Sequence, residues 1–137
     1  MRKRTRAREC ALKVLYQSEV TKYDHVRSLR VFWELEANTE SAVKDFAEQL
    51  VEGVHKHIKE IDEVISRYAK NWNINRMALI DKNILRLATY EILYVDDIPH
   101  KVSINEAIDM AKKYGDTDSS KFVNGILDKI SKSEVTK

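Results

Sequence analysis

The sequence is poor in residues that break helices or cross-link a chain. Its 137 residues include three glycines, one proline and one cysteine. The single cysteine, Cys10, excludes an internal disulfide and a cysteine-rich zinc site, and its helical context indicates a small buried apolar residue. Turn residues are rare, and no stretch between them shows the alternating β-branched residues that are typical of a strand. We therefore predict an all-α fold. The length suits one compact domain spanning residues 1–137.

Long apolar runs are also missing from the sequence. No stretch approaches the roughly 18 uninterrupted apolar residues that a membrane-spanning helix needs. Charged and polar residues interrupt positions 9–20, so the start of the chain does not resemble a secretory signal. We therefore expect a cytoplasmic protein with no membrane partner.

Motifs of catalysis and metal binding are absent as well. The sequence has no glycine-rich phosphate loop, no G-x-S-x-G elbow and no His-x-x-x-His pair. His55 and His57 are two residues apart and so point to different helix faces, while His25 and His100 fall in predicted connectors, where a surface role is simplest. We expect no catalytic residues, no metal and no cofactor.

Basic residues are concentrated at the start of the chain. The net charge of the whole chain is +2, and residues 1–8 contribute +5, so residues 9–137 sum to −3. Cations at a helix N-terminus oppose the helix dipole by about 0.3–1 kcal/mol each. We infer that a polyanion outside the chain offsets this unfavourable charge. Nucleic acid is the first candidate for this partner, and an anionic membrane is the alternative. An arginine-rich amphipathic start also resembles a mitochondrial import signal.

Helical periodicity separates two faces within this first segment. One face is apolar and consists of Ala7, Ala11, Leu12, Val14 and Leu15. The opposite face carries Arg2, Arg6, Glu9, Lys13, Tyr16 and Gln17. Arg4 and Arg8 fall on the apolar side, so they must project past the core or find partners. Cations beside an exposed tyrosine favour single-stranded RNA over duplex DNA. A merely solvated basic face is equally compatible with the pattern.

The rest of the chain continues as helices. We predict a short helix over 29–35, another opened by the cap residues 38–41, a break between 55 and 59, and a helix across 77–95 that is apolar on most sides. A Ser103–Glu106 capping box should open the next helix, which stops at Gly115, and residues 116–118 should cap the last helix. Residues 131–137 read as a frayed polar tail.

Four residues inside these helices are given structural roles. Gly53 and Gly125 each cost a helix about 1 kcal/mol relative to alanine, so we expect both to mark close helix packing. Arg86 and Glu91 lie within the apolar helix, where we expect them to pair with each other near the core.

Four motifs resemble the NusB family of bacterial transcription antitermination factors. They are DKNILRLATYE at 81–91, DIPHKVSINEA at 97–107, KFVNGILD at 121–128, and RARECA at 6–11 followed by Leu15 and Tyr16. The resemblance spans nearly the whole chain, although residues 21–41 show no recognised motif. Because the basic segment belongs to the domain in this family, the resemblance removes the import-signal interpretation.

The resemblance implies about seven helices in two packed three-helix bundles, with approximate limits of 1–57 and 58–137. It also implies RNA binding without catalysis, in which the protein and the ribosomal protein NusE hold the boxA element of nascent ribosomal RNA leaders for the antitermination complex of RNA polymerase. Matching positions suggest that RNA contacts Arg2, Lys3, Arg4, Arg6, Arg8, Tyr16, Asp118, Lys121 and Phe122. Asp81 matches a position facing NusE, although a first-turn helix acid is its plain alternative. From pattern alone, Phe122 is more typical of a core residue.

Two other functions remain open at this stage. One is a detached RNA-binding domain related to the N-terminal domain of ribosomal RNA cytosine methyltransferases. The other is a protein-only adaptor whose basic end is a solubilising face. A homodimer is compatible with the resemblance, because some members of the family are monomers and others dimers.

Overall fold

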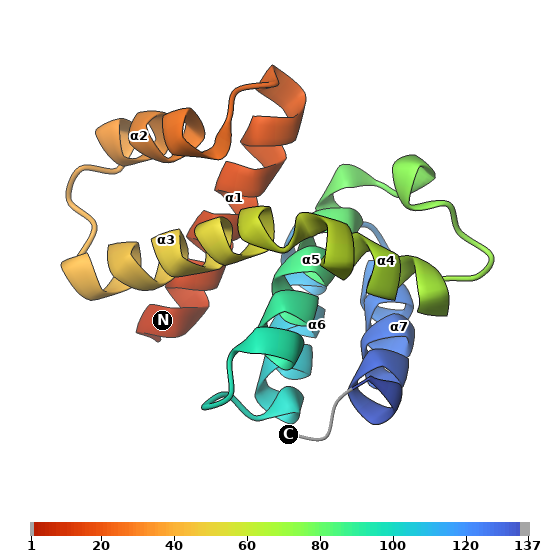
Figure 1. Ribbon diagram of the computed structural model, residues 1–137. Coiled ribbons are helices and arrows are strands. Elements are labelled where there is room, and N and C mark those ends of the chain that lie inside the picture. The colour runs from red at the N-terminus through yellow and green to blue at the C-terminus, as the bar shows by residue number, and fades with distance from the viewer. Residues whose placement is uncertain (1, 135–137) are drawn as a thin grey trace.

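Helices account for most of the part of the chain that the structure describes. The computed structural model describes residues 2–134, and within this part the chain forms seven α-helices, one 3-10 helix and no strand (Figure 1). The α-helices are α1 (Lys3–Thr21), α2 (His25–Leu35), α3 (Ser41–Lys56), α4 (Ile58–Tyr68), α5 (Leu79–Tyr94), α6 (His100–Tyr114) and α7 (Ser119–Ser133), and the 3-10 helix is η1 (Ile74–Arg76). The predicted all-α fold is confirmed.

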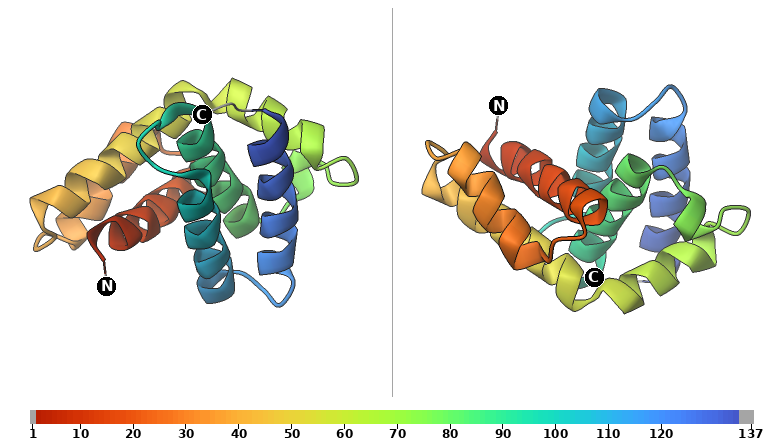
Figure 2. Two further views of the ribbon diagram at one scale, coloured as in Figure 1. Left: turned by 90° about the horizontal axis from the view of Figure 1, so that it is seen from below. Right: turned by 90° about the horizontal axis from the view of Figure 1, so that it is seen from above.

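The helices form two groups of three. Helices α1, α2 and α3 make the first bundle and α5, α6 and α7 the second, while α4 continues from α3 and packs across α5 and α7 (Figures 1 and 2). Helix α3 ends at Lys56 and α4 begins at Ile58, so the predicted break is present. Helix α1 packs on both α3 and α5, which joins the two bundles.

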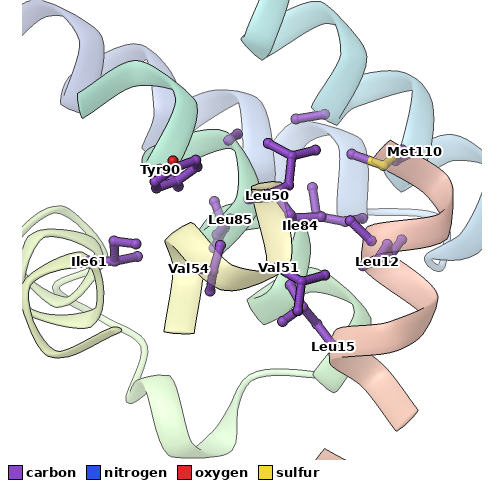
Figure 3. Close-up of a cluster of buried hydrophobic side chains, with 14 of the residues drawn as sticks. Leu12, Leu15, Leu50, Val51, Val54, Ile61, Ile84, Leu85, Tyr90 and Met110 are labelled. Atoms are coloured by element: carbon purple, nitrogen blue, oxygen red, sulfur yellow. The ribbon is translucent and has the colours of Figure 1, made fainter. Parts of the chain in front are cut away.

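One hydrophobic core runs through both bundles. Figure 3 shows side chains from five helices meeting there: Leu12 and Leu15 of α1, Leu50, Val51 and Val54 of α3, Ile61 of α4, Ile84, Leu85 and Tyr90 of α5, and Met110 of α6. Each fully buried aliphatic side chain contributes roughly 1.5–3 kcal/mol. The predicted apolar face of α1 is part of this core, and Cys10 is buried in it as a free thiol.

The two helical glycines behave differently. A Cβ atom built on Gly53 would lie 2.1 Å from Cζ of Tyr90, so α3 and α5 approach closely there, as expected. A Cβ atom on Gly125 would meet no described atom within 4 Å. The prediction of close packing at Gly125 is therefore wrong.

Two helix boundaries also differ from the predictions. Helix α6 begins at His100, directly after Pro99, because a proline fits just before the first turn, where a backbone N–H is not needed. Ser103 lies inside this helix, and its hydroxyl donates to Oε1 of Glu91 at 2.7 Å rather than capping the helix. Helix α2 begins at His25, capped by the carboxylate of Asp24, which accepts from the backbone N–H of Arg27 at 2.8 Å.

The predicted frayed tail is partly ordered. Helix α7 extends to Ser133, and the carboxylate of Glu134 accepts hydrogen bonds from Arg67 Nη1 at 2.8 Å and from the hydroxyl of Tyr68. Residues 131–134 are therefore anchored to α4, which corrects that prediction, and 135–137 lie outside the described residues.

The histidines placed in connectors are helical. The ring of His25 stacks on that of His55 with centroids 3.8 Å apart, and Nδ1 of His100 lies 2.8 Å from the hydroxyl of Ser131. Both residues begin helices. His25 links α2 to α3, and His100 links α6 to α7. Their assignment as connector residues on the surface was wrong.

Candidate nucleic-acid interface

The start of α1 presents a cluster of cations to solvent. Arg2 is the N-cap, makes no side-chain capping bond among the described residues, and is followed by a first turn without acids. Arg2, Lys3, Arg4 and Arg6 are all exposed. Because the helix dipole adds partial positive charge at this end, the site is electrostatically suited to an anion.

Two of these cations have weak local partners. Lys3 Nζ lies 3.2 Å from a carboxylate oxygen of Glu40. The guanidinium of Arg4 lies over the ring of Phe46, 4.5 Å from its centroid, and 3.9 Å from a carboxylate oxygen of Asp97. Exposed ion pairs contribute only about 0–1 kcal/mol, so both side chains can exchange these partners for a phosphate at little cost.

Arg8 is an interior ion-pair residue. Its side chain is only 4% exposed, with Nε and Nη2 donating to the two carboxylate oxygens of Glu91 at 2.7 and 2.9 Å, and Nη1 donating to Glu106 at 2.8 Å. Burial alone would lower the pKa of Arg8, but the hydrogen bonds and charges of Glu91 and Glu106 outweigh it and raise the pKa above its usual value. This corrects the expected RNA contact at Arg8.

The predicted Arg86–Glu91 pair is wrong for a geometric reason. Residues five apart on a helix lie roughly 140° apart around its axis, so the two side chains diverge. Arg86 instead binds Asp62 twice at 2.8 Å and Glu19 at 2.7 Å, while Glu91 binds Arg8. The bridge to Asp62 joins α5 to α4, and the bridges to Glu19 and Arg8 join α5 to α1.

The second predicted part of the interface lies at the start of α7. Asp118 and Lys121 are exposed there, whereas Phe122 is half-buried against the core. The rings of Phe122 and Trp72 pack edge to face, with centroids 5.4 Å apart and planes at 74°. Phe122 thus combines the expected core contact with a partly accessible ring.

The structure brings Asp81 into the same hollow as Asp118 and Phe122. This hollow has a volume of about 330 Å³ and is lined by Trp72, Arg76, Met77, Ala78, Asp81, Asp116, Asp118, Ser119 and Phe122. Asp81 lies in the first turn of α5, and its Oδ1 is buried with no hydrogen-bond partner among residues 2–134. Burial, helped by the charge of Asp116 and opposed by the Ser119 hydroxyl, raises the pKa of Asp81 above 3.8.

Trp72 and Arg76, which line this hollow, were not among the predicted site residues. Trp72 is 59% exposed in the segment between α4 and η1, and Arg76 ends η1 beside it. A tryptophan in a polar connector is itself a signal of a binding surface, because large aromatic rings are rarely left in water. That signal was present in the sequence.

Two negative findings complete the description of the site. Within residues 2–134 no helix is both long and apolar enough to cross a membrane. The same residues contain no group of three or more histidine, cysteine, aspartate or glutamate side chains that could hold a metal ion.

Together these features define a small all-α protein with an exposed basic helix start. The NusB family model matches residues 5–132, and the chain belongs to the NusB family. Curated relatives agree with this assignment. The chain is 46% identical to the transcription antitermination protein NusB of Thermodesulfovibrio yellowstonii over 97% of its own length and 94% of the relative's. It is 48% identical to the NusB protein of Anaeromyxobacter dehalogenans, over 93% and 89%.

Solved structures show the same fold. NusB of T. maritima superposes with a TM-score of 0.90 at 41% identity, covering 97% of this chain and 93% of that chain. A chain from a crystal structure of the antitermination factors NusB and NusE in complex with dsRNA gives a TM-score of 0.87 at 30% identity, covering 97% and 98%. These two solved structures thus share the fold of this chain.

Proposed function

We propose that this protein is a transcription antitermination factor that binds single-stranded boxA RNA of nascent ribosomal RNA leaders together with the ribosomal protein NusE. The observation that carries the proposal is the exposed cation cluster on a helix start that has neither an acid nor a side-chain cap. Membership of the NusB family supports the role. So does the related complex that contains NusB, NusE and dsRNA.

The proposed RNA-binding surface has two parts. Arg2, Lys3, Arg4 and Arg6 attract the phosphate backbone, and Tyr16, half-exposed on the same helix, offers a ring for an unstacked base. At the start of α7, Asp118, Lys121 and Phe122 form the second part. Asp81 is the proposed contact for NusE, because an almost buried carboxylate oxygen without a partner would gain from a donor on that protein.

The mechanism we propose is tethering rather than catalysis. Binding energy holds the leader RNA against the protein, and NusE links this complex to RNA polymerase in the cytoplasm. Arg8, Glu91 and Glu106 have a supporting part in it, because they fix the basic turn of α1 onto α5 and α6. The exposed cations therefore start from a defined position, which reduces the entropy lost on binding.

A titration of labelled RNA tests the proposal. Fluorescence anisotropy would compare a boxA-type RNA with a scrambled RNA, with and without NusE. We expect tighter binding of the boxA-type RNA, strengthened by NusE, and a loss with Arg6→Glu that is absent with Arg30→Glu, an exposed control on α2. Equal binding of both RNAs would reject the proposal and favour the protein-only adaptor.

A further inference from the structure

The last turn of α6 lies against the exposed face of α1. Lys113 Nζ is 3.0 and 3.1 Å from the two carboxylate oxygens of Glu9, and the hydroxyl of Tyr114 donates to Glu9 at 2.7 Å. Nothing in the proposed RNA site uses these residues. They are nevertheless adjacent to both parts of that site.

Their position follows from helix geometry. Glu9 and Lys13 lie between Arg6 and Tyr16 on one face of α1, since residues three or four apart are neighbours on a helix. Tyr114 ends α6, and only four residues separate it from Ser119, where α7 begins. The last turn of α6 therefore connects the basic start of α1 with the start of α7.

Positive charge continues across this connection. Two ammonium groups lie over the ring of Tyr114, with Lys13 Nζ 5.8 Å and Lys113 Nζ 5.4 Å from its centroid. Lys112 is exposed beside them. Half of the Lys113 side chain is exposed, whereas only 12% of the Glu9 side chain is.

Glu9 is the acid on this basic face, and its charge is already neutralised. The hydrogen bond from Lys113 to Glu9 raises the pKa of the lysine, which keeps it cationic. Because half of the Lys113 side chain is in water, its ion pair with Glu9 contributes little to stability, so Lys113 can leave Glu9 for a stronger anion without unfolding the helix contact. Tyr114 would still hold the carboxylate in place.

We propose that Lys113 binds an RNA backbone phosphate between the two parts of the RNA site, and that Glu9 is the internal anion which this phosphate displaces. The inference rests on the proposed RNA-binding function. Lys13 and Lys112 add charge around the same phosphate, and Tyr114 is a positioning residue that keeps the displaced carboxylate from turning toward the RNA. Glu9 thereby lowers RNA affinity in the native protein.

Salt titrations of three variants test this inference with the boxA-type RNA. Neutralising one phosphate on single-stranded RNA changes the slope of log K against log salt by about 0.7. Lys113→Gln should make the slope shallower by about 0.7 and weaken binding. Glu9→Gln should strengthen binding, and this gain should shrink in the Glu9→Gln/Lys113→Gln double variant, because the two residues act on one phosphate.

The exposed pair of Lys132 and Asp128 on α7 provides a matched control, with its charged atoms 3.0 Å apart. Lys132→Gln and Asp128→Asn should leave affinity and slope unchanged. Thermal melts should show that Glu9→Gln and Lys113→Gln remain folded, since glutamine forms helices about as readily as glutamate and lysine do.

The outcomes separate the two proposals. If the native protein fails to bind the boxA-type RNA, the RNA-binding function and this inference both fall. If the native protein binds but Lys113→Gln keeps its slope, or Glu9→Gln does not strengthen binding, only the role of Lys113 and Glu9 is overturned.

Discussion

The buried ion pair of Arg8 makes the sharpest prediction about stability. Replacing Arg8 by glutamine removes three charge-assisted hydrogen bonds and leaves Glu91, a residue only 1% exposed, without its guanidinium. Removing one partner of a buried pair costs about 3–5 kcal/mol, because the other charge stays buried. At about 2 °C or more per kcal/mol for a domain of this size, the melting temperature should fall by at least about 6 °C.

Arg6 provides the matched comparison, since it is two residues earlier on the same helix and exposed. Arg6→Gln should leave the melting temperature unchanged or raise it slightly, because removing a cation from the helix start gains about 0.3–1 kcal/mol. Circular dichroism melts at pH 7 would measure both variants. RNA binding should show the opposite order, with Arg6→Gln the weaker binder among the folded proteins.

A double replacement checks the cause of the effect. Arg8→Met combined with Glu91→Leu removes both charges and should recover part of the stability lost by Arg8→Gln, since apolar residues can replace a buried pair. Equal, small melting shifts for Arg6→Gln and Arg8→Gln would refute the interior placement of Arg8.

Two further predictions concern helix packing and a buried acid. Gly53→Ala should destabilise the protein by about 1–3 kcal/mol, because the new Cβ meets the Tyr90 ring. Gly125→Ala should stabilise it by roughly 0.5–1 kcal/mol, because the new Cβ meets no described atom within 4 Å. Urea unfolding would measure both free energies, and the reverse order would contradict the contact between Gly53 and Tyr90. Asp81→Asn should stabilise the protein at pH 7, because burial raises the folded pKa above 3.8 and stability falls as pH rises through that window. This gain in stability should disappear below about pH 4. It should be absent at every pH for the exposed control Asp45→Asn. A gain that does not change with pH would show that the carboxylate charge is not its cause. The same Asp81→Asn variant should bind NusE more weakly in calorimetry while keeping its affinity for RNA.

Local patterns predicted the features that depend on neighbours along the chain. The apolar face of α1 and the break after Lys56 follow from helical periodicity, which needs no knowledge of the partner helix. The prediction for Gly53 was correct because a glycine within a long apolar pattern costs stability unless a close contact requires it. The same argument failed at Gly125, whose helix face is open.

Contacts between distant residues could not be read from these patterns. Arg8 and Glu91 are 83 positions apart, and nothing local indicates that a basic residue on the apolar side of α1 pairs with an acid on α5. Ser103 and Glu106 have the spacing of a capping box, yet the same spacing lets both reach across to neighbouring helices. Side-chain spacing fixes which residues share a face but not what that face meets.

The candidate site shows the same division. Motif resemblance placed residues from both ends of the chain in one RNA site, and the exposed cations at the start of α1 agree with that placement. The burial of Arg8 argues against a place for it in the site. The hollow that Trp72 and Phe122 line together adds Trp72 as a candidate. The contact of Lys113 with Glu9 joins residues 104 positions apart and needed the structure.

The salt dependence of boxA RNA binding tests the central claim most directly. Five exposed cations of the proposed site, Arg2, Lys3, Arg4, Arg6 and Lys121, predict a slope of log K against log salt near −3.5, at about −0.7 for each phosphate. The further phosphate proposed at Lys113 would bring the slope to about −4.2. The affinity should also be higher for the boxA-type RNA than for its scrambled counterpart at every salt concentration. Binding that is insensitive to salt and equal for both RNAs would contradict the assignment of the basic helix start to RNA recognition.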